Sequence, residues 1–476
     1  MPLIFPSNTL SAGGFSADNS CRFNRADDAV LTRTHGTPTL GTKFTWSGWI
    51  KRSTLGADQY FAMHWQDASD YGYFYFRTGD DIRFFDRHTG DSDTVWISNS
   101  LFRDCSAWYH IFIKCDTTQA TDTNRFKVFI NGVQDTGNGI TYPAQDAEMA
   151  FSKASDTDRI SIGGSGDGSN HMGGYFSEVA FMDGTAYDHT DLGEFDEDSP
   201  TIWKPKDPST LTFGDNGYYL DFEDSDNLGD DESGNASDFT ETNIDATDQA
   251  TDTPTNSFAT FNSLSKNESG TVTFSEGNLY TAHSGSDSAY CSYSTIGIAS
   301  GKWYGEFKFV ASSGGTDMAV GVGYDLEENN RTGAHIGYSA GSYDYNAFGN
   351  KHNDGNESSY GDTYGVGDII GVALDLDNHK LYFSKNGTWQ DSGDPESGAT
   401  GTGSAFDLTT GQTYFMGASH ATATSRTTDY AGNYGGCPAF AISSGNADGN
   451  GYGNFEYAPP SGYLAPCTKN LGSDGG

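Results

Sequence analysis

Basic side chains are scarce in this chain of 476 residues. Only 26 Lys and Arg stand against 65 Asp and Glu, so the formal net charge is −39. A nucleic-acid partner is not expected, because binding to phosphate requires a cationic face. The same argument speaks against anionic membrane surfaces. Acidic residues keep a protein dispersed, particularly in salty water where their repulsion is screened, and we expect that role for the charge as a whole.

Long apolar runs are missing too, so membrane insertion is not expected. The start, MPLIFPSNTL, has no basic region and does not resemble a secretory signal. Cysteines are few and form no CxxC pair, which argues against zinc. Buried thiols are expected rather than disulfides, with a Cys105–Cys115 bridge as the minor alternative. The six cysteines are Cys21, Cys105, Cys115, Cys291, Cys437 and Cys467.

Helix-forming stretches rich in Ala, Leu, Glu and Lys are also absent. The chain instead has 61 Gly, 27 Tyr and 31 Phe, the balance of an aromatic-packed β protein with many turns. Its length is too great for one core. We therefore expect an all-β protein of more than one domain.

The most informative stretch is 365–389, GVGDIIGVALDLDNHKLYFSKNGTW. Ile370, Val372 and Leu374 alternate with their neighbours at the period of a strand. Asp377-Asn378-His379 has turn chemistry, and Asn386-Gly387 is the strongest short hairpin signal because both residues tolerate positive φ. The stretch predicts two strands and two tight turns, with no residues arranged for catalysis.

This hairpin resembles the central hairpin of the SPRY (B30.2) family. Other segments are similar to the family's strands in the expected order: GKWYGEF at 301–307, MAVGVGY at 318–324, GSYDY at 341–345 and a closing strand at 454–463. The resemblance covers about residues 259–465. It implies a β-sandwich that binds and does not catalyse.

The first half also reads as strands, at 44–51, 108–115, 125–130 and 218–222. WYHIFIKC at 108–115, a polar loop and RFKVFINGV at 125–133 resemble the laminin-G-like, or concanavalin-like, jelly roll. GGYFSEVAF at 173–181 is similar to a further strand of that family. This resemblance covers about residues 20–240, and together the two resemblances imply two antiparallel β-sandwich (jelly-roll) domains in tandem.

The acidic, Pro- and Thr-containing stretch that ends at Asn256 reads as an interdomain connector. The sequence of this connector resembles a recurring segment in virion proteins of marine bacteriophages. The expected organisation is an N-terminal docking arm at 1–20, a laminin-G-like sandwich at 21–245, a linker at 246–258, a SPRY-like sandwich at 259–468 and a tail at 469–476.

A Tyr-rich region among Gly, Ser and Asn precedes the hairpin and has the composition of a binding face. Tyrosine rings also suit sugars, which stack on π systems. We expect ligand contacts from Tyr343, Tyr345 and Tyr360. Trp389, after the Asn-Gly turn, is a further candidate, with packing in the core as the alternative for all four.

Oxygen ligands cluster between 224 and 235, and calcium takes six to eight of them. The candidate ligands are Asp226, Asp230, Asp231 and Asn235. The spacing is not that of an EF-hand. Calcium is the one cofactor that the sequence admits, and a flexible acidic turn is the alternative.

Two motifs have the outline of a catalytic site. Gly337–Gly341 fits G-x-S-x-G, yet no helix pattern follows Ser339, as a nucleophile elbow requires. Glu194, Asp196 and Asp198 alternate as in a concanavalin-like glucanase, but they lie in a charged stretch that ends at Pro200. We therefore do not expect an enzyme.

These observations favour a structural protein on the virion surface of a marine bacteriophage. The expected role is a tail fibre or appendage that adheres to a host-surface glycan or protein. Its other partners would be virion proteins bound through the N-terminal arm, and copies of itself in a homo-oligomer. The alternatives are a capsid decoration or head-fibre protein and a glycoside hydrolase of concanavalin-like fold.

Overall fold

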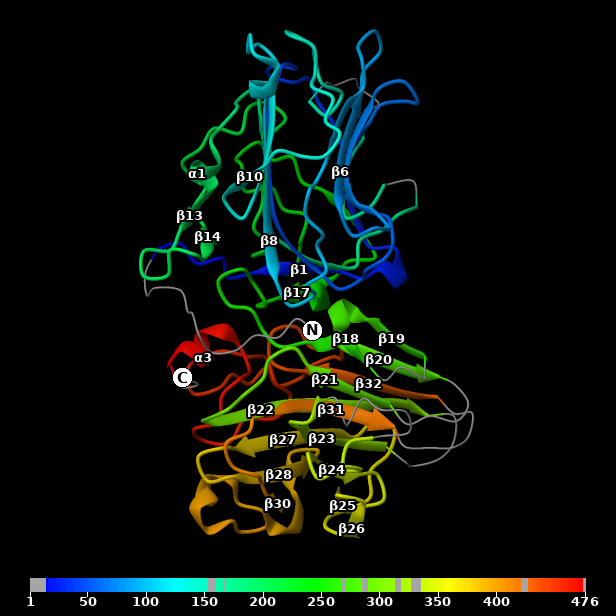
Figure 1. The fold of residues 1–476 in the computed structure, drawn as a ribbon, viewed down its shortest axis with the longest axis vertical. Coiled ribbons are helices and arrows are strands. Elements are labelled where there is room, and N and C mark those ends of the chain that lie inside the picture. The colour runs from blue at the N-terminus through cyan, green and yellow to red at the C-terminus, as the bar shows by residue number, and fades with distance from the viewer. Residues whose placement is uncertain are drawn as a thin grey trace. The chain divides into compact units, whose positions relative to one another are not determined.

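The computed structural model describes residues 14–152, 159–165, 168–266, 271–284, 290–312, 318–326, 335–420 and 427–473. The chain divides into two compact units, the first ending at Thr255 and the second beginning at Asn256 (Figure 1). Within the described residues, no helix is both long enough and apolar enough to cross a membrane.

The first unit contains two large antiparallel sheets and a small hairpin. The eight-stranded sheet has the order β10-β9-β8-β3-β12-β1-β17, with β15 paired to β12. Its strands are β1 (Ser20–Phe23), β3 (Lys43–Arg52), β8 (Trp108–Asp116), β9 (Phe126–Ile130), β10 (Val133–Asp135), β12 (Gly174–Asp183), β15 (Tyr218–Leu220) and β17 (Gln249–Ala250).

The seven-stranded sheet of this unit has the order β16-β2-β11-β4-β5-β6-β7. Its strands are β2 (Val30–Thr34), β4 (Gln59–Trp65), β5 (Tyr71–Phe76), β6 (Ile82–Arg87), β7 (Thr94–Ile97), β11 (Arg159–Ile162) and β16 (Thr240–Thr242). The hairpin joins β13 (Gly193–Phe195) to β14 (Trp203–Pro205). The described residues of this unit also form four helices of three or four residues: η1 (Arg25–Asp27), η2 (Asp122–Asn124), α1 (His189–Leu192) and η3 (Ala246–Asp248).

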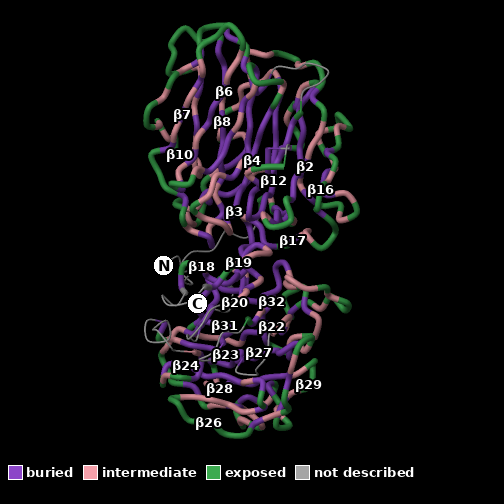
Figure 2. Tube along the Cα trace, turned by 90° about the vertical axis from the view of Figure 1, so that its right-hand side faces the viewer, coloured by how far each residue is buried: buried purple, intermediate pink, exposed green. Residues whose placement is uncertain are grey.

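One aromatic core fills the space between the two large sheets. Trp46 on β3 packs against Phe61 on β4 and Phe74 on β5, with ring centroids 5.7 and 5.8 Å apart. All three side chains are fully buried and belong to one cluster with Ile113 and Phe176. Burial of a side chain of this size contributes roughly 2–3 kcal/mol, so this shared layer is what joins the sheets. Figure 2 shows buried stretches along the strands and exposed turns between them.

The second unit is also built from two sheets. The first has the order β18-β21-β31-β23-β24-β25-β26. Its strands are β18 (Phe261–Lys266), β21 (Tyr290–Ser294), β23 (Met318–Gly323), β24 (Ser342–Asn346), β25 (Asn350–Asn353), β26 (Asn356–Ser359) and β31 (Phe415–His420).

The second sheet has the order β19-β20-β32-β22-β27-β28-β29, with β30 paired to β28. Its strands are β19 (Thr271–Ser275), β20 (Tyr280–Ser284), β22 (Lys302–Ser312), β27 (Ile369–Asp375), β28 (Lys380–Lys385), β29 (Thr388–Trp389), β30 (Phe406–Asp407) and β32 (Thr428–Asn433). Among the described residues of this unit, short helices are η4 (Glu276–Asn278), η5 (Gln390–Ser392), η6 (Pro395–Thr400) and α3 (Thr468–Ser473).

These sheets confirm the predicted fold class, which is all-β with two antiparallel sandwiches. The hairpin at 365–389 forms as predicted: Ile370 pairs with Lys385 and Asp375 with Lys380. Asn386 and Gly387 have positive φ values of 48° and 77°, as the tight turn requires. The expected closing strand at 454–463 is reduced to one isolated bridge between Phe455 and Asn446. Pro459 and Pro460 lie in that stretch and have no N–H to donate to a ladder.

The segment expected as a linker packs on the first unit up to Thr255. Gln249 pairs with Cys21, so β17 extends the large sheet. Asp252 is 1% exposed and accepts hydrogen bonds from Lys51 Nζ (2.6 Å) and Trp108 Nε1 (3.0 Å). A buried ion pair with a further hydrogen bond fixes this end of the segment. Its acidic, turn-rich sequence had predicted an interdomain linker instead.

Most of the expected N-terminal arm, residues 1–13, lies outside the described residues. In the part that is described, Thr255 Oγ1 donates a hydrogen bond to the Ala17 carbonyl (2.8 Å), and Ser20 Oγ donates one to the Asp252 carbonyl (2.6 Å). All six cysteine side chains are buried, as expected, and Cys115 is a free thiol, so the Cys105–Cys115 bridge does not form.

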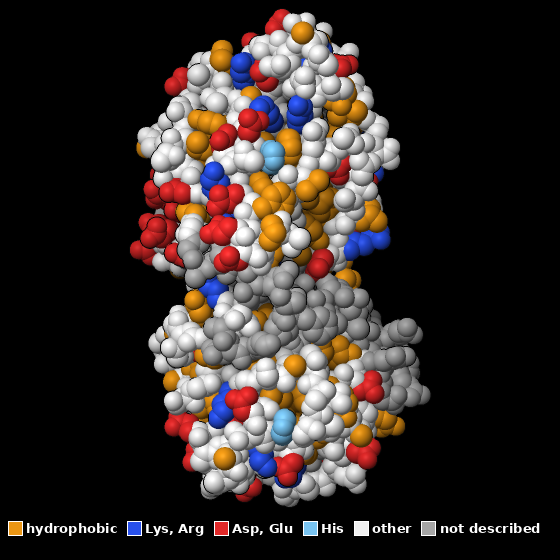
Figure 3. Space-filling view, turned by 60° about the vertical axis from the view of Figure 1, so that its left-hand side comes forward, with side chains coloured by type: hydrophobic (Ala, Val, Ile, Leu, Met, Phe, Trp, Pro, Cys, Tyr) orange, Lys and Arg blue, Asp and Glu red, His pale blue; other side chains and the backbone are white. Residues whose placement is uncertain are grey.

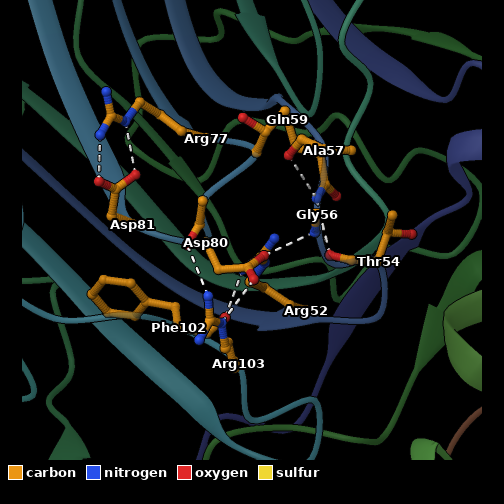
Figure 4. A network of polar contacts seen from close by, with 12 residues as sticks. Arg52, Thr54, Gly56, Ala57, Gln59, Arg77, Asp80, Asp81, Phe102 and Arg103 are labelled. Carbon is orange, nitrogen blue, oxygen red and sulfur yellow. Dashed lines mark hydrogen bonds and ion pairs between the residues drawn. The ribbon is translucent and has the colours of Figure 1, made fainter.

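A buried arginine ties β3 to the loop between β5 and β6 (Figure 4). Arg52 is fully buried and lies 4.2 Å over the ring of Phe76. Its Nη1 is 3.3 Å from Asp80 Oδ1, and Asp80 Oδ2 accepts a hydrogen bond from Arg103 Nε (3.0 Å). Gly56 N donates to Asp80 Oδ1 as well (2.8 Å). Asp80 therefore neutralises a guanidinium that has no access to water.

We expect Asp80→Asn to lower the free energy of unfolding by about 3 kcal/mol, because it leaves Arg52 buried without a counter-charge. Asp81→Asn is the matched control. Asp81 pairs with Arg77 in the same loop, where Arg77 is 36% exposed, so its loss costs less than about 1 kcal/mol. Urea unfolding of the two variants measures the difference, and equal losses would contradict the role of Asp80.

Four buried carboxyl groups hold protons near neutral pH. Burial raises the pKa of Asp86, Glu306 and Asp344 to about 7 and that of Glu178 to about 8, because the charged form loses its hydration. The unfolded chain releases these protons near pH 4.5, so the stability that they contribute is lost as pH rises through the folded values. Buried His35 and His110 have lowered pKa values of about 4 and about 3, so their opposite effect is at its strongest below about pH 6.5 and fades above it.

We expect the raised pKa of Glu178 to make the free energy of unfolding of the parent fall between about pH 6.5 and 8, relative to a variant that lacks this carboxyl group. Glu178→Gln keeps an acceptor for the Tyr219 hydroxyl, which bonds to Glu178 Oε2 at 2.5 Å. This variant should reduce the fall by about 1.5 kcal/mol. Denaturant titrations at several pH values measure the slope, and Glu148→Gln, at an exposed position, serves as the control. A Glu178→Gln slope equal to that of the parent would refute the assignment.

Candidate functional site

The outer face of the seven-stranded sheet in the first unit carries an unusual number of aromatic side chains. In β5 the inward residues Phe74 and Phe76 belong to the core, while Tyr71, Tyr73 and Tyr75 alternate with them and lie on the opposite face. A second set of rings on β4 and β6 lies beside these tyrosines. We call this surface the aromatic platform, and its rings are Tyr60, Trp65, Tyr71, Tyr73, Tyr75 and Phe85.

The rings of the platform form a stack across three neighbouring strands. Tyr73 on β5 lies between Tyr60 on β4, at 5.1 Å and 10°, and Phe85 on β6, at 5.2 Å and 17°. Tyr71 extends the stack with a ring centroid 5.2 Å from that of Trp65. The order follows from the strand register, which pairs Tyr73 with Phe85 and Tyr71 with Trp65. The platform is therefore rigid, because its rings are fixed to paired strands.

Several of these side chains remain open to solvent. Trp65 is 37% exposed, and Tyr60, Tyr71 and Tyr73 are half-buried. Burial together with neighbouring Tyr75 raises the pKa of Tyr73 to about 12, so its hydroxyl stays protonated and can donate a hydrogen bond. Exposed rings of this kind offer flat apolar area with polar tips.

Two arginines lie at the edge of the aromatic platform. The Arg83 guanidinium lies 5.1 Å from the ring centroid of Phe85, and that of Arg87 lies 5.5 Å from the ring centroid of Tyr71. Arg87 is held in place by Asp93, whose Oδ2 is 2.8 Å from Arg87 Nη2. Planar guanidinium groups beside aromatic rings can donate hydrogen bonds to hydroxyl or carboxylate oxygens of a ligand that stacks on the rings.

The tyrosines expected as ligand contacts lie elsewhere, in the interior of the second unit. Tyr345 is fully buried, and its hydroxyl donates to the Asp362 carbonyl. Tyr343 is 5% exposed beside Phe406, and Tyr360 is 7% exposed beside Tyr345. Trp389 packs at the edge of another buried cluster. Alternation on β24 places the two tyrosines toward the core, so the structure gives these rings a packing role.

Two of the residues expected to bind calcium have hydrogen-bond partners within the protein. Asp231 accepts hydrogen bonds from the backbone N–H groups of Tyr219, Ser233 and Ser237. The Asn235 amide donates to the Gly214 carbonyl (2.6 Å). Asp226 is exposed and Asp230 is half-buried. Asp231 thus organises the turn with the oxygens that a cation would need, which accords with the acidic-turn alternative.

Neither catalytic motif acquires the context that it needs. Ser339 lies in a turn that leads into β24, with no helix after it. Asp196, whose side chain is fully buried, binds Lys204 Nζ at 3.2 Å, and Glu194 lies 3.8 Å from the same nitrogen. These carboxylates surround a lysine. Figure 3 shows that acidic side chains gather at one edge of the first unit.

One group of potential metal ligands is present in the described part of the chain. His335, Asp344 and His352 have ligand atoms that all lie within 4.8 Å of one another. Burial raises the pKa of Asp344 to about 7 and lowers that of His335 to about 4. The sequence analysis missed this group, because 17 residues separate the histidines. It also missed the platform, which the alternation in YGYFYF at 71–76 could have indicated.

The two units match different family models. Residues 24–188 match the model of the Concanavalin A-like lectin/glucanases superfamily, and residues 302–428 match that of the SPRY domain. Both resemblances seen in the sequence are thereby confirmed at the level of the domain, each over less than half of the chain. No curated protein sequence matches the chain.

Two solved structures are similar to parts of the chain. The SPRY domain of human HERC1 is 19% identical, with a TM-score of 0.29, over 38% of this chain and 99% of its own. A heptameric SAP-like pentraxin from Limulus polyphemus is 15% identical, with a TM-score of 0.28, over 37% of this chain and 80% of its own.

We expect Tyr345→Ala to lower the free energy of unfolding by about 3–5 kcal/mol, because it opens a cavity among buried rings. Tyr338→Ala provides the comparison, since Tyr338 is 53% exposed and its loss should change stability by less than about 0.5 kcal/mol. Thermal and urea unfolding measure both. A Tyr345→Ala variant with the stability of the parent would contradict the packing role of Tyr345.

Proposed function

We propose that the protein is a non-enzymatic adhesin, a tail fibre or appendage on the virion surface of a marine bacteriophage, and that it recognises a host-surface glycan. The aromatic platform is the observation that carries the glycan part of the proposal. Sugar rings present flat C–H faces that stack on aromatic side chains, while guanidinium and hydroxyl groups bind their oxygens. Trp65, Tyr71, Tyr73 and Arg87 provide these groups on one rigid sheet face.

The family match of the first unit supports the same ligand class, because its description names lectins and glucanases. Binding is favoured over hydrolysis because Glu194 and Asp196 surround Lys204. The placement on a phage particle rests on the resemblance of the connector and of the tandem arrangement to virion proteins. The acidic surface would keep such an appendage dispersed in salt water.

We expect Trp65→Ala and Tyr73→Ala each to weaken binding of the full-length protein to glycan arrays and to host cells at least tenfold, which corresponds to about 1.4 kcal/mol per substitution. Circular dichroism and melting temperature show whether each variant folds. Tyr457→Ala, a half-buried tyrosine of the second unit, is the control and should bind like the parent.

Unchanged binding by both platform variants would refute the assignment of this surface. Release of reducing sugar from a polysaccharide panel, abolished by Glu194→Gln, would instead identify a glycoside hydrolase. Electron cryomicroscopy of particles distinguishes an appendage from a capsid decoration protein by the position of the chain.

A further inference from the structure

Three polar side chains meet on one face of a sheet in the second unit, opposite to the face that packs in the core. Asp344 on β24 is directly paired with His352 on β25, and His352 is paired with Glu357 on β26. The three side chains therefore form a row across neighbouring strands. His335, from the segment before β24, lies next to this row, with its Nε2 3.4 Å from His352 Nδ1.

The distances among the ligand atoms suit a tetrahedral metal ion. His352 Nδ1 is 3.8 Å from Asp344 Oδ2, and all three atoms lie within 4.8 Å of one another. Ligands placed 2.0–2.2 Å from a tetrahedral ion are about 3.4 Å apart. A small contraction around an ion would thus bring these atoms to bonding distance.

Asp344 provides an independent indication of a ligand. Its side chain is 1% exposed, and neither carboxylate oxygen has a hydrogen-bond partner. An unpartnered buried carboxylate is costly, and such groups in proteins are paired or bind metals. Gly337 leaves room on this side, since a Cβ at that position would lie 2.5 Å from Asp344 Oδ2. The backbone is therefore shaped around the carboxylate without supplying a donor to it.

The site opens into a cavity of about 330 Å³. Its rim includes Asn346, Asn350 and Glu357, and the two amides donate hydrogen bonds to Glu357 Oε1 at 2.7 and 3.0 Å. Glu357 is thereby fixed beside the two histidines and adds negative charge to the rim. An ion can enter from solvent, and the cavity leaves space for water or a further ligand.

We propose that His335 Nε2, His352 Nδ1 and Asp344 bind one divalent transition-metal ion, with Zn²⁺ the best match. Two imidazoles and one carboxylate are ligands typical of zinc, whereas calcium takes oxygen ligands only. The absence of CxxC pairs argued against zinc in the sequence, but these ligands come from three separate segments and include no cysteine. The bound ion would join the segment at 335 to strands β24 and β25.

The test uses full-length protein without a polyhistidine tag, treated with a chelator and then titrated with Zn²⁺ by calorimetry. We expect one ion per chain, confirmed by elemental analysis, and a visible absorption band of tetrahedral Co²⁺ when that ion replaces Zn²⁺. Asp344→Asn, His335→Gln and His352→Gln should each weaken Zn²⁺ binding at least about tenfold, since even indirect support of a metal ligand is worth that much.

Asp344→Asn separates loss of the ligand from loss of the fold. It removes a buried carboxylate whose oxygens accept no hydrogen bond, so the metal-free variant should melt at the same temperature as the parent or higher. Zn²⁺ should raise the melting temperature of the parent and leave that of the variant unchanged.

His88→Gln is the matched control, because His88 in the first unit also faces two carboxylates, with its Nδ1 3.2 Å from Asp91 Oδ2 and its Nε2 3.6 Å from Asp70 Oδ1. It should bind Zn²⁺ like the parent. Binding that is unchanged in all three site variants, or lost in His88→Gln alone, would overturn the proposal.

Discussion

The shared layer of buried aromatic rings is the constraint on which the first unit depends. Trp46, Phe61 and Phe74 come from both sheets and have no contact with water. Since side chains alternate along a strand, fixing one face in the core also fixes which residues lie on the other. The aromatic platform follows from this: once Phe74 and Phe76 pack in the core, Tyr71, Tyr73 and Tyr75 must lie on the opposite face of the sheet. Core packing and the candidate binding surface are two consequences of one register.

The same rule has the opposite result in the second unit. On β24, Tyr343 and Tyr345 are buried, which turns Asp344 to the outer face of the sheet beside His352. The core thus takes the tyrosines that looked suited to ligand contact, and the outer face takes the carboxylate. A register shifted by one residue would exchange these roles. Metal ligands and core rings in this strand are therefore linked through the backbone.

Buried charged side chains in this chain differ in whether they have hydrogen-bonded partners. Arg52 and Lys51 each have an acidic partner, Asp80 and Asp252, within a network that includes further hydrogen bonds. Such pairs fix the ends of strands and tie a distant segment to a sheet. Asp344 has no such donor. In a chain with 65 acidic side chains, surface carboxylates are common and carry little information, whereas a buried carboxylate without a donor is informative because its burial requires compensation.

The amino-acid sequence by itself determined the fold class, the hairpin at 365–389 and the main strands of both sandwiches, because period-two alternation and turn chemistry act between near neighbours. It also determined the two family resemblances. Only the tertiary structure decided which aromatic rings are accessible. Local composition does not distinguish Tyr71 from Tyr345, and the sheet register alone determines which face each ring occupies. It likewise decided that residues 246–255 pack on the first unit and that His335, Asp344 and His352 meet. These contacts join residues distant in the chain, and no local pattern encodes them.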